Sequence, residues 1–247
     1  MKEVRFFYVP DASDVKELPE EEAQHAVRVL RMAMGDEMML MDGQGTFYRA
    51  VVTEATKKRC FYKIEEVLPQ ERQWTPRLHL AMAPTKNMDR TEWFAEKATE
   101  IGFDELTFLK CRWSERMVVK TERIEKILVS AMKQSHKAWK PFLNEMTDFV
   151  AFMRLVEDME KKNGKPMQKF ICHCYEETDW GEKVALKDAV RRGEDVLVLV
   201  GPEGDFSIEE VKMAEAKGFR SATLGKSRLR TETAALAAVH IINLINQ

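Results

Sequence analysis

Two short polar loops near the C-terminus carry residues that could hold a ligand. The first, residues 201–206 (GPEGDF), follows an unbroken apolar run at 196–200. In an open parallel sheet, ligands bind beyond the carboxyl ends of the central strands, where such a loop would lie. Its glycines let the backbone approach a ligand closely, and its proline stiffens the turn. A tight strand-to-helix turn without a ligand has the same composition, so both interpretations stay open for this loop alone.

The second loop, residues 224–234 (LGKSRLRTETA), directly precedes a very apolar helix. Three basic residues, one acid and three hydroxyl side chains fall within these eleven positions. Such a concentration of polar groups beside a buried element indicates a functional role. The helix at 231–245 is apolar almost all round, which is typical of a core helix or of a subunit interface.

The elements that must position these loops change character along the chain. Residues 1–67 predict short strands and one helix, as in a small barrel. A polar segment with prolines, 68–76, is the predicted linker. Beyond it, strands alternate with helices of ten residues or more, which predicts a mostly parallel sheet covered on both faces. The predicted strands are 4–9, 38–41, 46–53, 61–67, 77–83, 105–109, 168–174, 195–200 and 221–224, and the predicted helices are 19–31, 87–101, 121–136, 147–161, 183–191, 207–217 and 231–245.

Composition narrows the class of protein. The 247 residues are 45% hydrophobic and 32% charged, as in a soluble globular protein. No apolar run is long enough to span a membrane and the N-terminus lacks a secretory signal, so we expect a cytoplasmic protein without membrane association. Among the four cysteines, only Cys172 and Cys174 are closely spaced. Because no second pair exists, we favour reduced thiols and predict no metal site.

Basic residues concentrate in one stretch although the formal net charge is only -2. Residues 110–140 hold nine lysines and arginines against three glutamates, and they include Trp113 and Trp139. Basic side chains with interleaved aromatic rings can neutralise phosphates and stack on unpaired bases. An ordinary solvated helix face has a similar composition, so this stretch alone leaves RNA binding open.

Several motifs taken together resemble one family. GPEGDFS at 201–207, GF at 218–219 and LGKSRLRTETAA at 224–235 resemble the RsmE family of 16S ribosomal RNA uridine-N3 methyltransferases, which belong to the SPOUT class. The likeness continues through HAVRVLRMAMGDEMMLMDGQGTFYRA at 25–50, Lys86, EKATEIG at 96–102 and SERMVV at 114–119. It covers nearly the whole chain.

The resemblance implies a fold and a set of partners. Residues 1–70 would form a PUA-like β-barrel that helps to hold RNA. Residues 74–247 would form an α/β SPOUT methyltransferase domain that ends in a trefoil knot. The cofactor would be S-adenosylmethionine, the partner small-subunit ribosomal RNA, and the assembly a homodimer with its active site near the subunit interface.

The resemblance also assigns residues by position. Those implied to bind the cofactor, mainly through backbone groups, are His173, Leu199, Gly201, Pro202, Glu203, Gly204, Leu224, Gly225, Ser227 and Leu229. Those expected to contact RNA are Arg28, Arg31, Arg112, Arg116 and Lys137. Two positions depart from the family pattern: Asp205 stands where the family usually has glycine, and QSHK at 134–137 replaces an arginine-bearing version.

Arg230 and Glu232 are the candidate catalytic residues. Uridine N3 must lose its proton before it attacks a methyl group, and the negative charge then spreads over the flanking carbonyl oxygens. A guanidinium offers a planar fork to such oxygens, so Arg230 is the candidate cation. Glu232 is a candidate base or an orienter of Arg230. Alternatively, the two side chains only pair with each other at the start of the helix.

Other functions remain compatible with these motifs. The loops would bind the cofactor and not the acceptor, so a methyltransferase for another RNA base or for transfer RNA is one alternative. A non-catalytic RNA-binding ribosome-assembly factor, in which both loops are only turns, is another.

Overall fold

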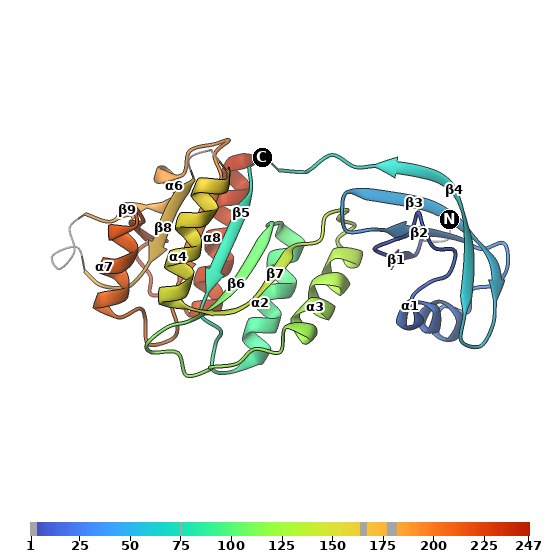
Figure 1. Cartoon of the computed structure of the whole chain (residues 1–247), viewed down its shortest axis with the longest axis horizontal. Coiled ribbons are helices and arrows are strands. Elements are labelled where there is room, and N and C mark those ends of the chain that lie inside the picture. Colours follow the sequence, from blue (N-terminus) through green and yellow to red (C-terminus); the bar gives the residue numbers. More distant parts are fainter. Residues whose placement is uncertain (1–3, 75, 164–166, 177–181) are drawn as a thin grey trace. The chain divides into compact units, whose positions relative to one another are not determined.

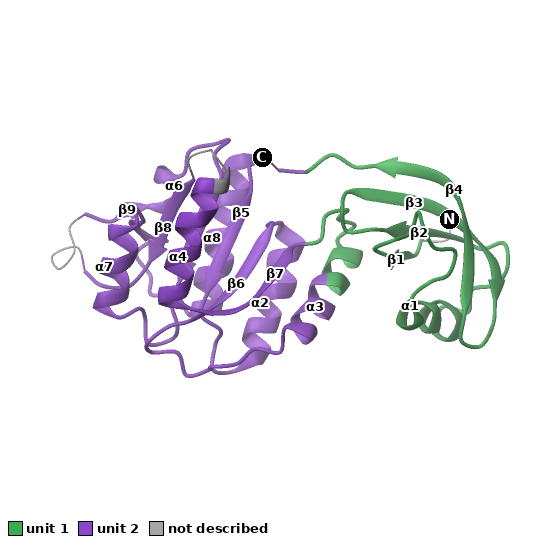
Figure 2. Ribbon diagram, in the orientation of Figure 1, with its two compact units in different colours: residues 1–72, 129–140 green, residues 73–128, 141–247 purple. Residues whose placement is uncertain are grey.

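The computed structural model describes residues 4–74, 76–163, 167–176 and 182–247, which form two compact units (Figure 2). Unit 1 comprises residues 1–72 and 129–140, and unit 2 comprises 73–128 and 141–247. The predicted domain limits, 1–70 and 74–247, differ from this division in one respect, because 129–140 groups with unit 1. The border between the units therefore falls within a helix, α3 (Thr121–Gln134).

Unit 1 is a small β-rich unit, as predicted. Its described strands form one sheet of order β1-β2-β3-β4, parallel between the first two and antiparallel thereafter. The strands are β1 (Phe6–Tyr8), β2 (Glu37–Met41), β3 (Thr46–Ala55) and β4 (Cys60–Pro69). The predicted first helix is observed as α1 (Glu20–Gln24), which continues as the π-helix η1 (His25–Val29). Phe7, Leu40 and Tyr62 lie in the core of this unit.

Residues 129–140 belong to unit 1 because they pack on its β2–β3 turn. The amide of Gly45 donates a hydrogen bond of 2.9 Å to the carbonyl of Ala138. The Trp139 ring lies so close that a Cβ on Gly45 would come within 2.2 Å of it. Gly45 also has φ +107°, a backbone conformation that disfavours other residues. Only glycine therefore fits at this position.

Unit 2 is an α/β unit whose described strands form a seven-stranded parallel sheet of order β7-β6-β5-β10-β8-β11-β9. The strands are β5 (Leu78–Met82), β6 (Glu105–Lys110), β7 (Phe142–Asp148), β8 (Gln168–Cys172), β9 (Val184–Ala185), β10 (Val196–Val200) and β11 (Arg220–Thr223). Besides α3, the helices are α2 (Met88–Ile101), α4 (Phe149–Asn163), α6 (Leu186–Ala189), α7 (Ile208–Ala216) and α8 (Thr231–Asn246).

Helices cover both faces of this sheet, which confirms the sequence-based prediction (Figure 1). Alternate residues of the central strand β10 belong to different cores. Val198 lies in one core with Val239 of α8, and Leu199 lies in the other with Phe149 of α4 and Val211 of α7. Because both faces of β10 are buried, its sequence is apolar throughout.

Two differences from the predicted elements have a physical reason. Strand β7 was not predicted, because its residues Phe142–Asp148 are mostly half-buried or exposed at the sheet edge and show no apolar alternation. The predicted helix at 183–191 is instead the short strand β9 followed by a single turn, α6. None of the helices in the described part of the chain is long and apolar enough to cross a membrane.

The predicted linker is anchored to unit 2 at Trp74. The indole Nε1 of Trp74 donates a 3.0 Å hydrogen bond to Asp104, and only 8% of the residue is exposed. A Cβ on Gly102 would come within 2.5 Å of the ring. Trp74 is therefore a core residue of unit 2 at the end of a polar segment.

A partly buried polar network lies at the amino ends of the strands in unit 2. His79 Nε2 lies 2.8 Å from Thr107 Oγ1, and the Arg77 guanidinium donates to Glu105 at 2.6 Å. Asn144 donates to both Glu105 and Thr107. Burial lowers the pKa of His79 to about 4. The imidazole is therefore neutral in the folded protein at neutral pH.

His79 should make the protein less stable as the pH falls from about 6.5 to about 4. In this range the unfolded chain binds a proton that the folded chain does not. The free energy of unfolding therefore decreases as the pH decreases. The pKa difference corresponds to a loss of about 3 kcal/mol. Urea unfolding of wild type and His79→Gln across this range measures it, and we expect a shallower pH dependence in the variant. Equal slopes would mean that His79 accepts a proton in the folded state.

Candidate functional site

A cavity of about 430 Å³ opens beyond the carboxyl ends of β8 and β10. Both loops singled out by the sequence contribute to it, although residues 207–223, which include α7 and β11, separate them. Helix α2 closes a further side. The residues that line the cavity are Arg90, Cys172, Cys174, Val200, Gly201, Pro202, Glu203, Asp205, Arg228, Leu229, Arg230, Thr231 and Ala234.

Steric limits and one carboxylate set the shape of the first loop. A Cβ on Gly201 would lie 3.0 Å from the backbone nitrogen of Phe206 and equally close to its ring. Asp205 adopts φ +69°, and its carboxylate accepts hydrogen bonds from the amides of Cys174 at 2.7 Å and Phe206 at 2.8 Å. Asp205, the departure from the family pattern, thus ties this loop to the chain just after β8.

The rest of the first loop is bonded to neighbouring segments. Ser207 and Glu210 form a capping box at the start of α7. Glu210 also accepts a 2.8 Å hydrogen bond from the amide of Arg112, which follows β6. Glu203 accepts a 3.0 Å hydrogen bond from the amide of Lys86, which follows β5. Hydrogen bonds therefore join the loops that follow three neighbouring strands, at the carboxyl ends of these strands.

The second loop places basic side chains at the cavity. Arg228, Leu229 and Arg230 line it, and α8 begins at Thr231. Within the described part of the chain, the Arg230 side chain takes part in no hydrogen bond or ion pair. Gly225 adopts φ +132° and lies away from the cavity lining. The guanidinium of Arg230 is therefore available to a bound molecule.

Glu232 is a buried carboxylate beside this cavity. Only 7% of the residue is exposed, and its Oε1 lies 3.9 Å from Nε of Arg90 on α2. Its Oε2 is buried and lacks a hydrogen-bond partner among the described residues. Glu232 therefore faces Arg90, and no hydrogen bond or ion pair joins it to Arg230 among the described residues. Sequence reasoning missed Arg90, because α2 is distant in the chain.

The predicted cofactor residues separate into two groups. Gly201, Pro202, Glu203 and Leu229 line the cavity, as does the catalytic candidate Arg230. The others are outside the lining: His173, Leu199, Gly204, Leu224, Gly225, Ser227 and the catalytic candidate Glu232. Besides Arg90, the lining residues that the sequence did not assign lie within or directly beside the predicted motifs: Cys172, Cys174, Val200, Asp205, Arg228, Thr231 and Ala234.

His173 is held within the protein at the end of β8. Its Nε2 lies 2.9 Å from Ser221 Oγ, which donates to Glu215 on α7. Burial, followed by the nearby ammonium of Lys183, lowers the pKa of His173. Leu199 is completely buried on the face of β10 that packs against α4 and α7. Both residues therefore support the fold beside the cavity.

The two cysteines at the cavity are thiols. Burial raises the pKa of Cys172 to about 12 and also raises that of Cys174. Both are free cysteines. Within the described ranges, no group of three His, Cys, Asp or Glu side chains is arranged to hold a metal ion.

The predicted RNA-contacting residues lie in different environments. Arg28 and Arg31 are exposed on unit 1, whereas Lys137 is only 8% exposed, and burial lowers its pKa. On unit 2, Arg112 pairs with Glu209 at 3.3 Å, and Arg116 donates to the carbonyl of Lys86. Arg112 and Arg116 thus lie at the carboxyl ends of the strands, where the cavity opens. Lys137 is instead a buried residue of unit 1.

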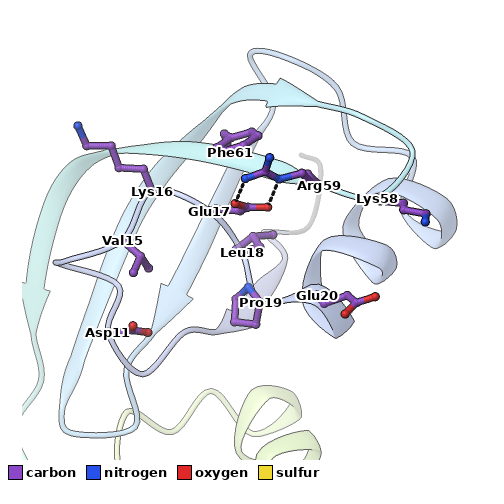
Figure 3. A pocket seen from close by; sticks show the side chains of 10 residues that line it. All are labelled: Asp11, Val15, Lys16, Glu17, Leu18, Pro19, Glu20, Lys58, Arg59 and Phe61. Carbon is purple, nitrogen blue, oxygen red and sulfur yellow. Dashed lines mark hydrogen bonds and ion pairs between the residues drawn. The ribbon is translucent and has the colours of Figure 1, made fainter.

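A second hollow, of about 800 Å³, lies on unit 1 (Figure 3). Arg59 forms a bidentate ion pair with Glu17 there, and its guanidinium lies over the Phe61 ring. The remaining charged residues, Lys16, Lys58, Asp11 and Glu20, balance one another. The hollow therefore offers no concentrated charge to a ligand.

Comparisons with known proteins agree over nearly the whole chain. Residues 72–243 match the family described as RNA methyltransferase domain, and residues 18–65 match the RNA methyltransferase PUA domain. The ribosomal RNA small subunit methyltransferase E of Rickettsia conorii is 28% identical, over 93% of this chain and 89% of that protein.

Two solved structures share the fold. A probable rRNA-methyltransferase from Porphyromonas gingivalis is 39% identical, with a TM-score of 0.88 and 98% of each chain covered. A putative methyltransferase from Legionella pneumophila, in complex with the bound cofactor S-adenosylmethionine, is 27% identical, with a TM-score of 0.83 and the same coverage.

Proposed function

This chain belongs to the RNA methyltransferase family, and we propose that it transfers a methyl group from S-adenosylmethionine to N3 of a uridine in small-subunit (16S) ribosomal RNA. Its fold is a PUA-like domain joined to an α/β methyltransferase domain of the SPOUT type. The observation that carries the proposal is the cavity between the loops at 201–206 and 224–231.

The residues present fit S-adenosylmethionine. A cavity of about 430 Å³ is within the range of small-molecule sites. Gly201 has no room for a side chain, which allows backbone groups at the base of the loop to approach a bound nucleoside closely. Glu203 and Asp205 line the cavity together with three arginines, and their carboxylates offer negative charge to a cationic sulfonium. Backbone groups of 201–204 and 224–229 would hold the adenosine and methionine parts.

S-adenosylmethionine, when bound, supplies an electrophilic methyl group. The protein has to align the acceptor base with that group and stabilise the charge that develops on the base. The free guanidinium of Arg230 would lie against the uridine carbonyl oxygens, where negative charge gathers after N3 loses its proton. Glu232 would take that proton, or position Arg90, which faces it at 3.9 Å.

Two further expectations belong to this proposal. A homodimer is supported by exposed apolar side chains on two helices that pack together, Leu244 of α8, which is 60% exposed, and Trp93 of α2, which is 44% exposed. Sedimentation measurements should then give twice the 28.7 kDa mass of one chain. We place the enzyme in the cytoplasm with its ribosomal substrate. The trefoil knot implied by the resemblance stays a prediction.

The proposal is tested in cells that lack the gene. Mass spectrometry of small-subunit RNA should show one uridine without its N3 methyl group, which returns with the wild-type gene but not with an Arg230→Ala gene. Loss of a methyl group from transfer RNA or from another base would instead support the alternative acceptors. If calorimetry with the full chain detected no binding of S-adenosylmethionine, a non-catalytic assembly factor would be favoured.

A further inference from the structure

The segment between β6 and α3, residues 111–120, is fixed beside the cavity. The Arg116 guanidinium donates two hydrogen bonds, of 2.7 and 3.2 Å, to the carbonyl of Lys86. The ammonium of Lys86 pairs with Glu115 at 2.6 Å, and the amide of Lys86 donates to Glu203 of the first loop. Lys86 therefore connects this segment to a residue that lines the cavity.

The beginning of the segment is held equally firmly. The amide of Cys111 donates to Ser114 Oγ at 3.0 Å, and the amide of Arg112 donates to Glu210 at 2.8 Å. Trp113 packs on the first loop so closely that a Cβ on Gly204 would lie 3.0 Å from the Trp113 Cβ. The backbone at Trp113 thus has a defined position directly beside the cavity-lining loop.

The ring of Trp113 is nevertheless exposed. The residue is 51% exposed, and Met117 and Val118 of the same segment are 50% and 72% exposed. The Arg112 guanidinium lies 5.1 Å from the centroid of the indole ring. By contrast, Trp139 of the same basic stretch is packed on Gly45. A fixed backbone that presents an open aromatic ring is typical of a base-stacking position.

Charge around the segment favours RNA over an apolar partner. Lys110, Arg112, Arg116 and Lys120 lie within seven positions of Trp113 in the sequence, and Glu115 is the only acid between positions 110 and 120. Of these cations, Arg112 lies over the ring and also pairs with Glu209 at 3.3 Å. Such cations attract phosphates, and an exposed ring offers an unpaired base a stacking partner.

On the premise of the proposed function, we propose that Trp113 stacks on an unpaired base of the substrate RNA next to the nucleotide that enters the cavity. Arg112 and the neighbouring cations neutralise phosphates of the same strand. Trp113 is a positioning residue, because it holds the RNA and does not touch the reacting atoms.

The test measures the Kd of transcribed small-subunit RNA and of S-adenosylmethionine for variants of the full chain. Trp113→Ala should raise the RNA Kd about tenfold, as expected for one lost stacked base, and leave its salt dependence unchanged. Trp113→Phe should keep the RNA Kd within about threefold of wild type, and Trp113→Leu should behave like the alanine variant. The Kd of S-adenosylmethionine should stay the same in all three.

Phe142→Ala is the matched control, because Phe142 is 59% exposed at the opposite, amino end of the strands. An unchanged RNA Kd in Trp113→Ala, equal binding by the Leu and Phe variants, or an equal loss in Phe142→Ala would overturn the stacking role alone. If the wild-type protein binds S-adenosylmethionine but neither binds nor methylates small-subunit RNA, the proposed substrate fails, and the stacking role fails with it.

Discussion

Arg230→Ala should lower kcat for methyl transfer by at least about 100-fold, which corresponds to the loss of one fixed donor to a developing oxyanion. The Arg230 side chain lines the cavity and has no partner within the described residues, so its removal disturbs no internal bond. The Kd of S-adenosylmethionine should therefore change little. Single-turnover methylation and calorimetric titration measure the two quantities separately.

Two neighbouring substitutions sharpen this test. Lys226→Ala removes an exposed cation that is outside the cavity lining, and it should leave kcat unchanged if the position of the charge matters. Arg230→Lys keeps the charge but loses the planar fork, so it should restore only part of the rate. An equal loss of cofactor binding and of methylation in Arg230→Ala would reassign Arg230 to the cofactor.

Gly201→Ala should raise the Kd of S-adenosylmethionine about tenfold or more. The added Cβ would lie 3.0 Å from the backbone nitrogen of Phe206 and 3.2 Å from the carbonyl carbon of Asp205. Backbone atoms cannot relieve such a contact by a change of rotamer. The loop must therefore shift, at a cost of about 1–3 kcal/mol. Calorimetric titration and thermal unfolding of the same variant separate lost affinity from lost stability.

Gly193→Ala provides the control for that experiment. A Cβ on Gly193 meets no atom of the described residues within 4 Å, but its φ of +85° makes alanine strained. This variant should lower Tm without changing the Kd of the cofactor. Unchanged affinity in Gly201→Ala, at a similarly reduced Tm, would show that the loop at 201–206 does not shape the cofactor site.

Elements with a strong local pattern were predicted well. Strand β10 is apolar throughout because both faces are buried, and the capping box at Ser207 marks where α7 begins. Strand β7 has neither signal, since it lies at the sheet edge. Its pairing with β6 is visible only when the chain is folded.

The sequence by itself determined most of the strands and helices, though not β7 or β9, the two loops and, through the resemblance, the family and its cofactor. These are local properties, because residues within a few positions of one another decide hydrophobic period, caps and turns. The tertiary structure alone decided that Arg90 faces Glu232, that Asp205 ties the first loop to the end of β8, and that Trp113 is exposed while Trp139 packs on Gly45. Each of these contacts joins segments that are distant in the chain, and only the packing of helices and loops on the sheet brings them together.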